Sequence, residues 1–212
     1  KSEGDYVMAR PLRGPLNKTG IDHATDAYDT IEWLTHNVPQ SNGKVAMIGS
    51  SYLGMTTLMA TADPHPALKA VVPQSPMVDG WMGDDWFHNG AFRPFGFDYA
   101  LSQTVEKGGN GGVASGDSDE FDTYLKGGSA GDYARTWGVD QLPTLRKMLG
   151  HPAYDAYWQE QALDKVIARK APTVPMLLVV GQWDQEDSYG APAVFRALHK
   201  LDPEGKVVHL AI

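Results

Sequence analysis

Hydrophobic residues in the first part of the chain follow two kinds of spacing. From Asp22 to Leu34, apolar residues recur every three or four positions, which predicts an amphipathic helix with Asp22 as its N-cap. The runs at residues 44–48 and 68–73 are short and largely apolar, which predicts two buried strands, and a second helix is expected between them. Short helices and strands in this alternating order indicate a parallel sheet with crossover helices, and therefore an α/β fold.

The sheet pattern stops after Pro76 and returns near residue 173. A strand over 175–181, a helix over 192–201 and a last strand over 207–212 are expected beyond that point. We therefore expect a sheet domain in two parts, residues 1–76 and 173–212, interrupted by an insertion over 77–172 that forms a helical cap over the functional site.

The expected insertion is rich in aromatic residues and has no apolar strand pattern. Helices are expected within it at 118–126, 142–149 and 155–168. The aromatic residues between Trp81 and Tyr99 are expected to form the core of the insertion rather than a binding surface.

Composition limits the chemistry and the partners. The 212 residues contain no cysteine, which excludes disulfides, thiol catalysis and cysteine–zinc sites in this chain. The net charge of −8, without any basic run, argues against a nucleic-acid partner, and no apolar stretch is long enough to span a membrane. The chain begins without a methionine or a signal-peptide pattern and ends within a predicted strand, so we expect it to be an internal fragment.

Ser51 is the candidate nucleophile, because it lies on a tight turn between a predicted strand and a predicted helix. Gly49 precedes it by two residues, but Leu53 occupies the second glycine position of the G-x-S-x-G pattern, and Gly54 comes one place later. A serine on such a turn needs small neighbours, and the N–H of Tyr52 is placed to stabilise an oxyanion. The alternative is an ordinary glycine-flanked serine in a β–α turn.

Asp184 is the candidate orienting acid. It follows a predicted strand, and the order serine then acid is that of hydrolases whose triad runs Ser, Asp, His. The alternative is a turn or helix-capping aspartate. Among the histidines, only His199 and His209 follow Asp184, and they fall within a predicted helix and a predicted strand. We therefore expect the catalytic histidine beyond Ile212.

Further carboxylates follow Asp184 directly, at Glu186 and Asp187. Asp84 and Asp85 of the insertion are expected to meet them across the cleft. Converging carboxylates would bind a substrate ammonium group by charge-assisted hydrogen bonds. A Ca²⁺ or Mg²⁺ site and a solvated acidic loop are the alternatives, and we expect neither a metal nor another cofactor.

Several segments together resemble the α-amino acid ester hydrolases, a group within the wider cocaine-esterase-like and X-prolyl dipeptidyl-peptidase-like hydrolases. These segments, which are spread over essentially the whole chain, are residues 25–34, 49–54, 80–88, 153–155 and 183–187. The resemblance implies an α/β-hydrolase domain with a helical cap, here present as a partial sheet, and a C-terminal jelly roll that is not part of this chain.

The resemblance also implies roles for individual residues. Ser51 matches the nucleophile, Tyr52 supplies an oxyanion N–H, and Asp184 matches the triad acid. Asp85, Glu186 and Asp187 match the carboxylates that hold the substrate's α-ammonium group. The family's second oxyanion donor, a tyrosine hydroxyl, would come from upstream of Lys1. Family members form homotetramers and are periplasmic or secreted.

The function that we expect is cleavage or transfer of α-amino acyl groups of esters and β-lactam antibiotics through an acyl-enzyme. A fragment without the histidine is expected to be nearly inactive. A related cocaine-esterase-like or acylase-type serine hydrolase is one alternative, although an uncharged acyl group would not match three buried anions. A non-catalytic module that retains the hydrolase fold is the other.

Overall fold

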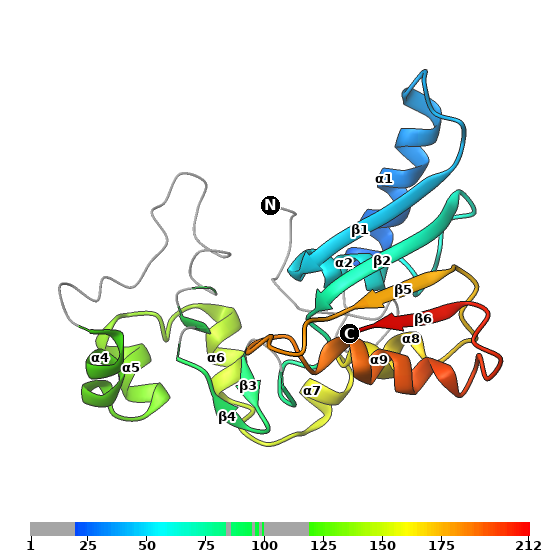
Figure 1. Ribbon diagram of the computed structural model, residues 1–212. Helices are drawn as coiled ribbons and strands as arrows, with labels where there is room; N and C mark the ends of the chain where they lie inside the picture. Colours follow the sequence, from blue (N-terminus) through cyan, green and yellow to red (C-terminus); the bar gives the residue numbers. More distant parts are fainter. Residues whose placement is uncertain (1–19, 84–85, 95, 98, 100–118) are drawn as a thin grey trace.

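The computed structural model describes residues 20–83, 86–94, 96–97, 99 and 119–212. Four parallel strands form the main sheet, in the order β1-β2-β5-β6 (Figure 1). They are β1 (Val45–Ser51), β2 (Leu68–Pro76), β5 (Met176–Val179) and β6 (Val208–Ala211). This confirms the expected parallel α/β sheet, with strand ends within a few residues of their predicted positions.

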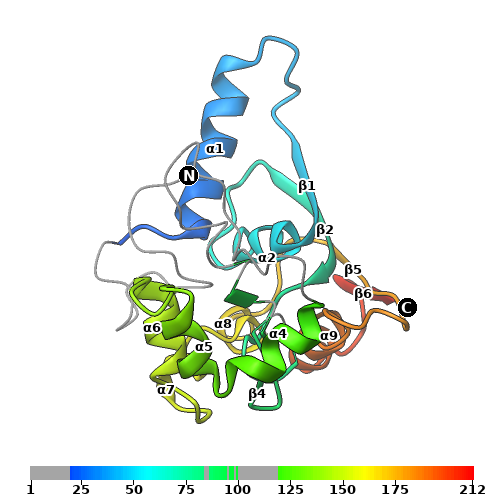
Figure 2. The same ribbon diagram turned by 90° about the vertical axis from the view of Figure 1, so that its left-hand side faces the viewer.

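Among the described residues, four helices pack side by side on one face of this sheet. They are α1 (His23–Asn37), α2 (Tyr52–Met59), α8 (Leu163–Ile167) and α9 (Gly190–His199). Helix α2 contacts both α1 and α8, and α8 contacts α9, so the four helices form a continuous layer (Figures 1 and 2). The core between helices and strands includes Met55, Leu58, Val71, Leu178 and Val194.

The opposite face of the sheet is open among the described residues. Ile48 of β1 is 68% exposed and Leu177 of β5 is 41% exposed, while the alternate residues of β5 are buried against the helices. The described sheet is therefore covered on one side only.

Helix α1 begins where the sequence predicts. The Asp22 carboxylate accepts hydrogen bonds from the backbone N–H groups of Ala24 (2.8 Å) and Thr25 (3.0 Å), and the Thr25 hydroxyl accepts one from the N–H of Asp22 (2.9 Å). This capping box satisfies N–H groups that have no partner within the helix. The N-cap prediction for Asp22 is confirmed.

The described part of the segment between β2 and β5 contains helices and a small hairpin. The hairpin joins β3 (Phe87–His88) to β4 (Ala91–Phe92), and the helices before α8 are α4 (Glu120–Gly127), α5 (Ala130–Thr136), α6 (Pro143–Leu149) and α7 (Ala156–Gln159). Figure 1 shows these elements beyond the carboxyl ends of the strands, where the arrowheads point. The aromatic rings of Phe87, Phe92, Phe97, Tyr133 and Trp158 pack on one another in this segment, as expected of a core.

Two expectations for this segment were wrong. The hairpin is a strand pair where no strand was expected, and the single helix expected over 155–168 is two helices, α7 and α8. The helix is interrupted because the N–H of Leu163 donates to the carbonyl of Val78, just beyond β2, at 2.9 Å. Helix α8 thereby joins α2 and α9 on the face of the sheet. Among the described residues, no helix combines the length and the apolar character that a membrane crossing needs.

Candidate active site

Ser51 is the last residue of β1 and immediately precedes α2. Its backbone has φ 57° and ψ −122°, a conformation that costs energy for any residue other than glycine. Strain of this kind persists only where the surrounding structure enforces it, and it is concentrated at functional sites. The geometry is that of a sharp strand-to-helix turn, with Ser51 at the N-terminus of α2, where backbone N–H groups favour negative charge.

The glycines around Ser51 are required by close backbone contacts. A Cβ atom at Gly49 would lie 2.3 Å from the carbonyl oxygen of Leu53, and one at Gly54 would lie 2.7 Å from that of Gln74 in β2. Leu53 itself is 61% exposed. The departure from G-x-S-x-G is therefore explained, because position 54 packs on β2 whereas position 53 faces outward.

Tyr52 is the first residue of α2, so its N–H lies at the positively polarised end of the helix. Its side chain makes a contact that no sequence pattern indicates. The Tyr52 hydroxyl lies 2.8 Å from Nε2 of His23, in the first turn of α1. Burial lowers the pKa of His23, although Asp26 and Asp22 oppose this change. A neutral His23 thus ties the start of α2 to the start of α1.

Asp184 lies in the turn after β5, and its carboxylate is held by several donors. Oδ1 accepts hydrogen bonds from the N–H groups of Glu186 (3.0 Å) and Asp187 (2.9 Å), and the Ser75 hydroxyl donates to the same carboxylate. Burial alone would raise the pKa of Asp184, but these donors and the nearby Arg93 hold it below its ordinary value. Asp184 is therefore ionised at neutral pH, as an acid that orients a histidine must be.

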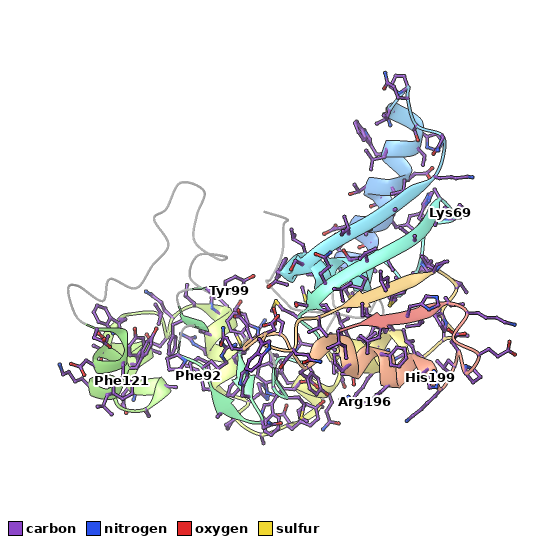
Figure 3. The ribbon with its side chains drawn as sticks, viewed as in Figure 1. Lys69, Phe92, Tyr99, Phe121, Arg196 and His199 are labelled. Carbon is purple, nitrogen blue, oxygen red and sulfur yellow. The ribbon has the colours of Figure 1, made fainter. Side chains whose placement is uncertain are left out.

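Ser51 and Asp184 lie at the same edge of the sheet. Ser51 ends β1, Ser75 lies at the end of the neighbouring β2, and Asp184 follows β5, the next strand. In parallel sheets, the carboxyl ends of the strands form this edge, and ligands bind there. His199 ends α9 on the side away from this edge (Figure 3), and His209 lies within β6. The expectation of a catalytic histidine beyond Ile212 stays a prediction.

The acidic residues after Asp184 differ in exposure. Asp187 is buried, with 3% of its surface exposed, whereas the Glu186 side chain is partly exposed. Oε1 of Glu186 lies 3.7 Å from a guanidinium nitrogen of Arg93, whose other terminal nitrogen donates to the Gln185 side-chain oxygen at 3.3 Å. Asp85 and its neighbour Asp84 lie outside the described residues, so their expected meeting with Glu186 and Asp187 stays a prediction.

The β3–β4 hairpin contacts residues 184–187, the acidic turn, from the insertion side. Arg93 follows β4 directly, and His88 of β3 donates a hydrogen bond to the backbone carbonyl of Glu186. Burial, together with the Arg93 charge, lowers the pKa of His88. Sequence reasoning missed Ser75, His88 and Arg93, because no spacing in the sequence shows which residues will face the turn after β5.

Two further observations bear on ligand binding. Among the described residues, no group of three or more histidine, aspartate or glutamate side chains could hold a metal ion. A cavity of about 640 Å³ opens at the opposite, amino end of the strands, between the ends of α2 and α8 and the start of β5. Met59, Ile167 and Met176 are among its lining residues, so it is separate from the Ser51 edge.

Comparison with known proteins gives consistent matches. The model of the family described as X-Pro dipeptidyl-peptidase (S15 family) matches residues 1–212. The crystal structure of an aminopeptidase from a marine sediment archaeon, Thaumarchaeota archaeon, is 54% identical, with a TM-score of 0.92 over 98% of this chain. An α-amino acid ester hydrolase structure is 55% identical, also with a TM-score of 0.92 over 98% of this chain.

A more distant relative is the cocaine esterase of Rhodococcus sp. (strain MB1 Bresler), which is 25% identical over an alignment of 207 residues that covers 86% of this chain. This chain spans 34% of the length of the cocaine esterase, and the same share of each of the two solved structures. The fold, with its mixed α/β architecture, agrees with that of the two solved structures over nearly all of this chain.

Proposed function

The chain belongs to the X-Pro dipeptidyl-peptidase (S15) family, and from this membership we propose that it is part of a serine hydrolase for α-amino acid esters. The observation that carries the proposal is the strained Ser51 at the junction of β1 and α2, on the same sheet edge as the ionised Asp184. Because the chain spans 34% of its relatives, the activity is proposed for a longer polypeptide that contains it.

In the proposed reaction, the Ser51 hydroxyl attacks the ester carbonyl carbon while a histidine takes its proton. The tetrahedral oxyanion is stabilised by the Tyr52 N–H at the N-terminus of α2. The alcohol leaves with that proton, and an acyl-enzyme remains. Water then gives hydrolysis, whereas an amine gives transfer of the acyl group. Asp184 orients the histidine, which lies outside this chain, and stabilises its charged form.

The acyl group is proposed to be recognised by its ammonium group. Glu186 and Asp187 supply negative charge beside Asp184, and Asp85 is proposed to complete the set. Support comes from the two relatives that are more than half identical, which are named as an α-amino acid ester hydrolase and an aminopeptidase. β-Lactam antibiotics with an α-amino acyl group are proposed substrates on the resemblance alone. A homotetramer in the periplasm or outside the cell is proposed on the same ground.

The alternative within serine hydrolases is a different acyl preference, and the cocaine esterase relative supports it. A cocaine-esterase-like pocket would take an uncharged acyl group, so the two proposals differ in what the carboxylates contribute. A non-catalytic module with the hydrolase fold is the remaining alternative, and it predicts no dependence of turnover on Ser51.

The deciding experiment compares kcat/KM for phenylglycine methyl ester with that for the analogue that lacks the amino group. We expect the amino ester to be preferred about a hundredfold or more, because an ammonium group paired with buried and partly buried carboxylates is worth a few kcal/mol. Glu186→Gln should reduce this preference, whereas Glu204→Gln, which removes an exposed acid near β6, should leave it unchanged.

Three outcomes separate the alternatives. Equal rates on the two esters, with activity that still requires Ser51, would favour the cocaine-esterase-like alternative. Turnover that persists in Ser51→Ala would contradict the assignment of the nucleophile. No turnover of either ester by the longer polypeptide would favour the non-catalytic module.

A further inference from the structure

Ser75 has an unusual backbone conformation for its position. Its φ is 35°, in the left-handed region that L-residues rarely adopt. It also precedes Pro76, and a residue before proline is normally extended, with φ of about −120°. Among the described residues, Ser51, Ser75 and Asn89 are the non-glycine residues with positive φ. Two of these three residues lie at the carboxyl edge of the sheet.

The register between β1 and β2 explains how this conformation arises. Ser50 is paired with Gln74, but the next residue, Ser51, is paired with Pro76. Ser75 is therefore the extra residue of a β-bulge in β2, directly beside the strained Ser51. Bulges next to active sites redirect a side chain that a regular strand would point elsewhere.

The bulge is enclosed by two helices that approach it through glycine. A Cβ atom at Gly54 of α2 would lie 2.7 Å from the Gln74 carbonyl oxygen and 3.0 Å from Cα of Pro76. A Cβ atom at Gly190, the first residue of α9, would lie 2.0 Å from the Pro76 carbonyl oxygen. Contacts this close on both flanks hold the backbone in its strained conformation.

The consequence of the bulge is a hydrogen bond from the Ser75 hydroxyl to the carboxylate of Asp184. The other described donors to Asp184 are the N–H groups of Glu186 and Asp187, which belong to its own turn. Ser75 is therefore the donor that ties this turn to the strand beside the nucleophile.

We propose that Ser75 is a positioning residue of the hydrolytic reaction, because the bulge aims its hydroxyl at Asp184 and fixes the carboxylate that orients the catalytic histidine. This inference rests on the proposed function, in which Asp184 is the triad acid. Ser75 does not touch the substrate in this account, and it acts on the chemical step through Asp184.

The test uses Ser75→Gly and Ser75→Ala in the longer polypeptide, with phenylglycine methyl ester as substrate. Both variants remove the hydroxyl, but glycine accepts a positive φ and alanine does not. We expect kcat to fall about tenfold to a hundredfold in both variants, as for loss of one hydrogen bond to a charged group, while KM changes less than about twofold. The Tm of Ser75→Gly should exceed that of Ser75→Ala. Ser41→Gly, which removes a serine from the turn before β1, is the matched control.

An unchanged kcat in Ser75→Gly would overturn the inference. If kcat then fell in Ser75→Ala, the effect would be assigned to backbone strain. Asp184→Asn in the same assay separates this inference from the proposed function. Full activity of Asp184→Asn would refute the triad assignment itself. Loss of activity in Asp184→Asn with normal kcat in Ser75→Gly would refute only the role of Ser75.

Discussion

At the scale of single residues, Arg93 is a cation of the insertion that faces the acidic turn. One guanidinium nitrogen lies near Glu186 and the other donates to Gln185, so a single planar group holds two consecutive side chains. Its charge also favours the ionised form of Asp184. Arg93 thus offsets the repulsion among the carboxylates at 184, 186 and 187 that would otherwise push them apart.

We expect Arg93→Met to weaken binding of the amino ester. Without the guanidinium, Glu186 loses both its countercharge and the contact that fixes its position relative to Asp184. KM for phenylglycine methyl ester should rise about fivefold to tenfold, with a smaller effect on the ester that lacks the amino group. Steady-state kinetics on both esters measures the effect.

Arg135→Met is the control for this prediction, because Arg135 is an exposed arginine of α5 that pairs with Asp132 of the same helix. Both variants remove one positive charge from the insertion, but only Arg93 reaches the acidic turn. A lower KM for the amino ester in Arg93→Met would show the opposite effect, namely that Arg93 competes with the substrate ammonium for the carboxylates.

The sequence predicts some of these residues and not others, for a physical reason. Ser51 and Asp184 are recognisable because strand ends and small neighbours are local features of the sequence. The roles of Ser75 and Arg93 depend on a shift in strand register and on the docking of a hairpin, which only the folded chain determines. Gln-Ser-Pro at 74–76 carries no signal of a bulge, since a serine before proline predicts extended backbone.

At the scale of elements, the contact between His23 and Tyr52 joins two helices next to the candidate nucleophile. Tyr52 is the first residue of α2, and His23 is the first residue of α1. Their rings also pack edge to face, with centroids 5.8 Å apart. The entry angle of α2, and with it the turn at Ser51, is therefore supported by the first turn of α1.

This contact predicts how stability depends on pH. Burial lowers the pKa of His23 in the folded protein, against the opposing effect of Asp26 and Asp22, whereas the unfolded chain takes up the proton near pH 6.5. Between these two pKa values the unfolded state binds more protons, so the free energy of unfolding falls as pH falls below about 6.5. We expect Tm to decrease between pH 7.5 and 5.5, and to decrease less in His23→Gln.

The readout is the difference between the Tm–pH slopes of the variant and the parent, measured by calorimetry, because other histidines contribute to both slopes. His36→Gln is the control, since His36 is exposed on the same helix and contacts residues of its own turn and the one before it. Equal Tm–pH slopes in His23→Gln and the parent would contradict the claim that the folded state disfavours the charged form of His23.

The elements themselves show which features of a fold can be derived from sequence. Long periodic segments and short apolar runs gave α1 and the four strands, because their signals are local and depend on burial of one face. The break between α7 and α8 depends on a hydrogen bond from Leu163 to Val78, which is remote in sequence. The hairpin of β3 and β4 has two residues in each strand, too few to show an alternating pattern.

At the scale of the whole molecule, the described structure presents apolar surface where a longer polypeptide would continue the fold. Ile48 of β1 is exposed on the open face of the sheet, and Trp183, next to Asp184, is 97% exposed. The relatives are about three times as long as this chain, which spans 34% of their length. We propose that other parts of a longer polypeptide cover these surfaces, and that residues 1–76 and 173–212 form one sheet domain interrupted by a cap at 77–172.

The last prediction concerns the 212-residue chain on its own. In the proposed reaction, Ser51 needs a histidine to take its proton, and neither His199 nor His209 lies at the sheet edge that Ser51 and Asp184 share. Loss of a triad member reduces kcat by several orders of magnitude in serine hydrolases. We therefore expect the isolated chain, once circular dichroism has shown that it is folded, to turn over phenylglycine methyl ester at least about a thousandfold more slowly than the longer polypeptide.

Comparable turnover by the isolated chain would contradict this expectation, provided that Ser51→Ala abolishes it, because a base within these residues would then be required. His88 would be the first residue to test, since it lies against the acidic turn and its lowered pKa keeps it neutral and able to accept a proton. His88→Gln would then remove the activity. The other possible result is that the isolated chain is inactive and that His88→Gln leaves the longer polypeptide active. In that case the base lies outside the 212 residues, and His88 only supports the turn that carries Asp184.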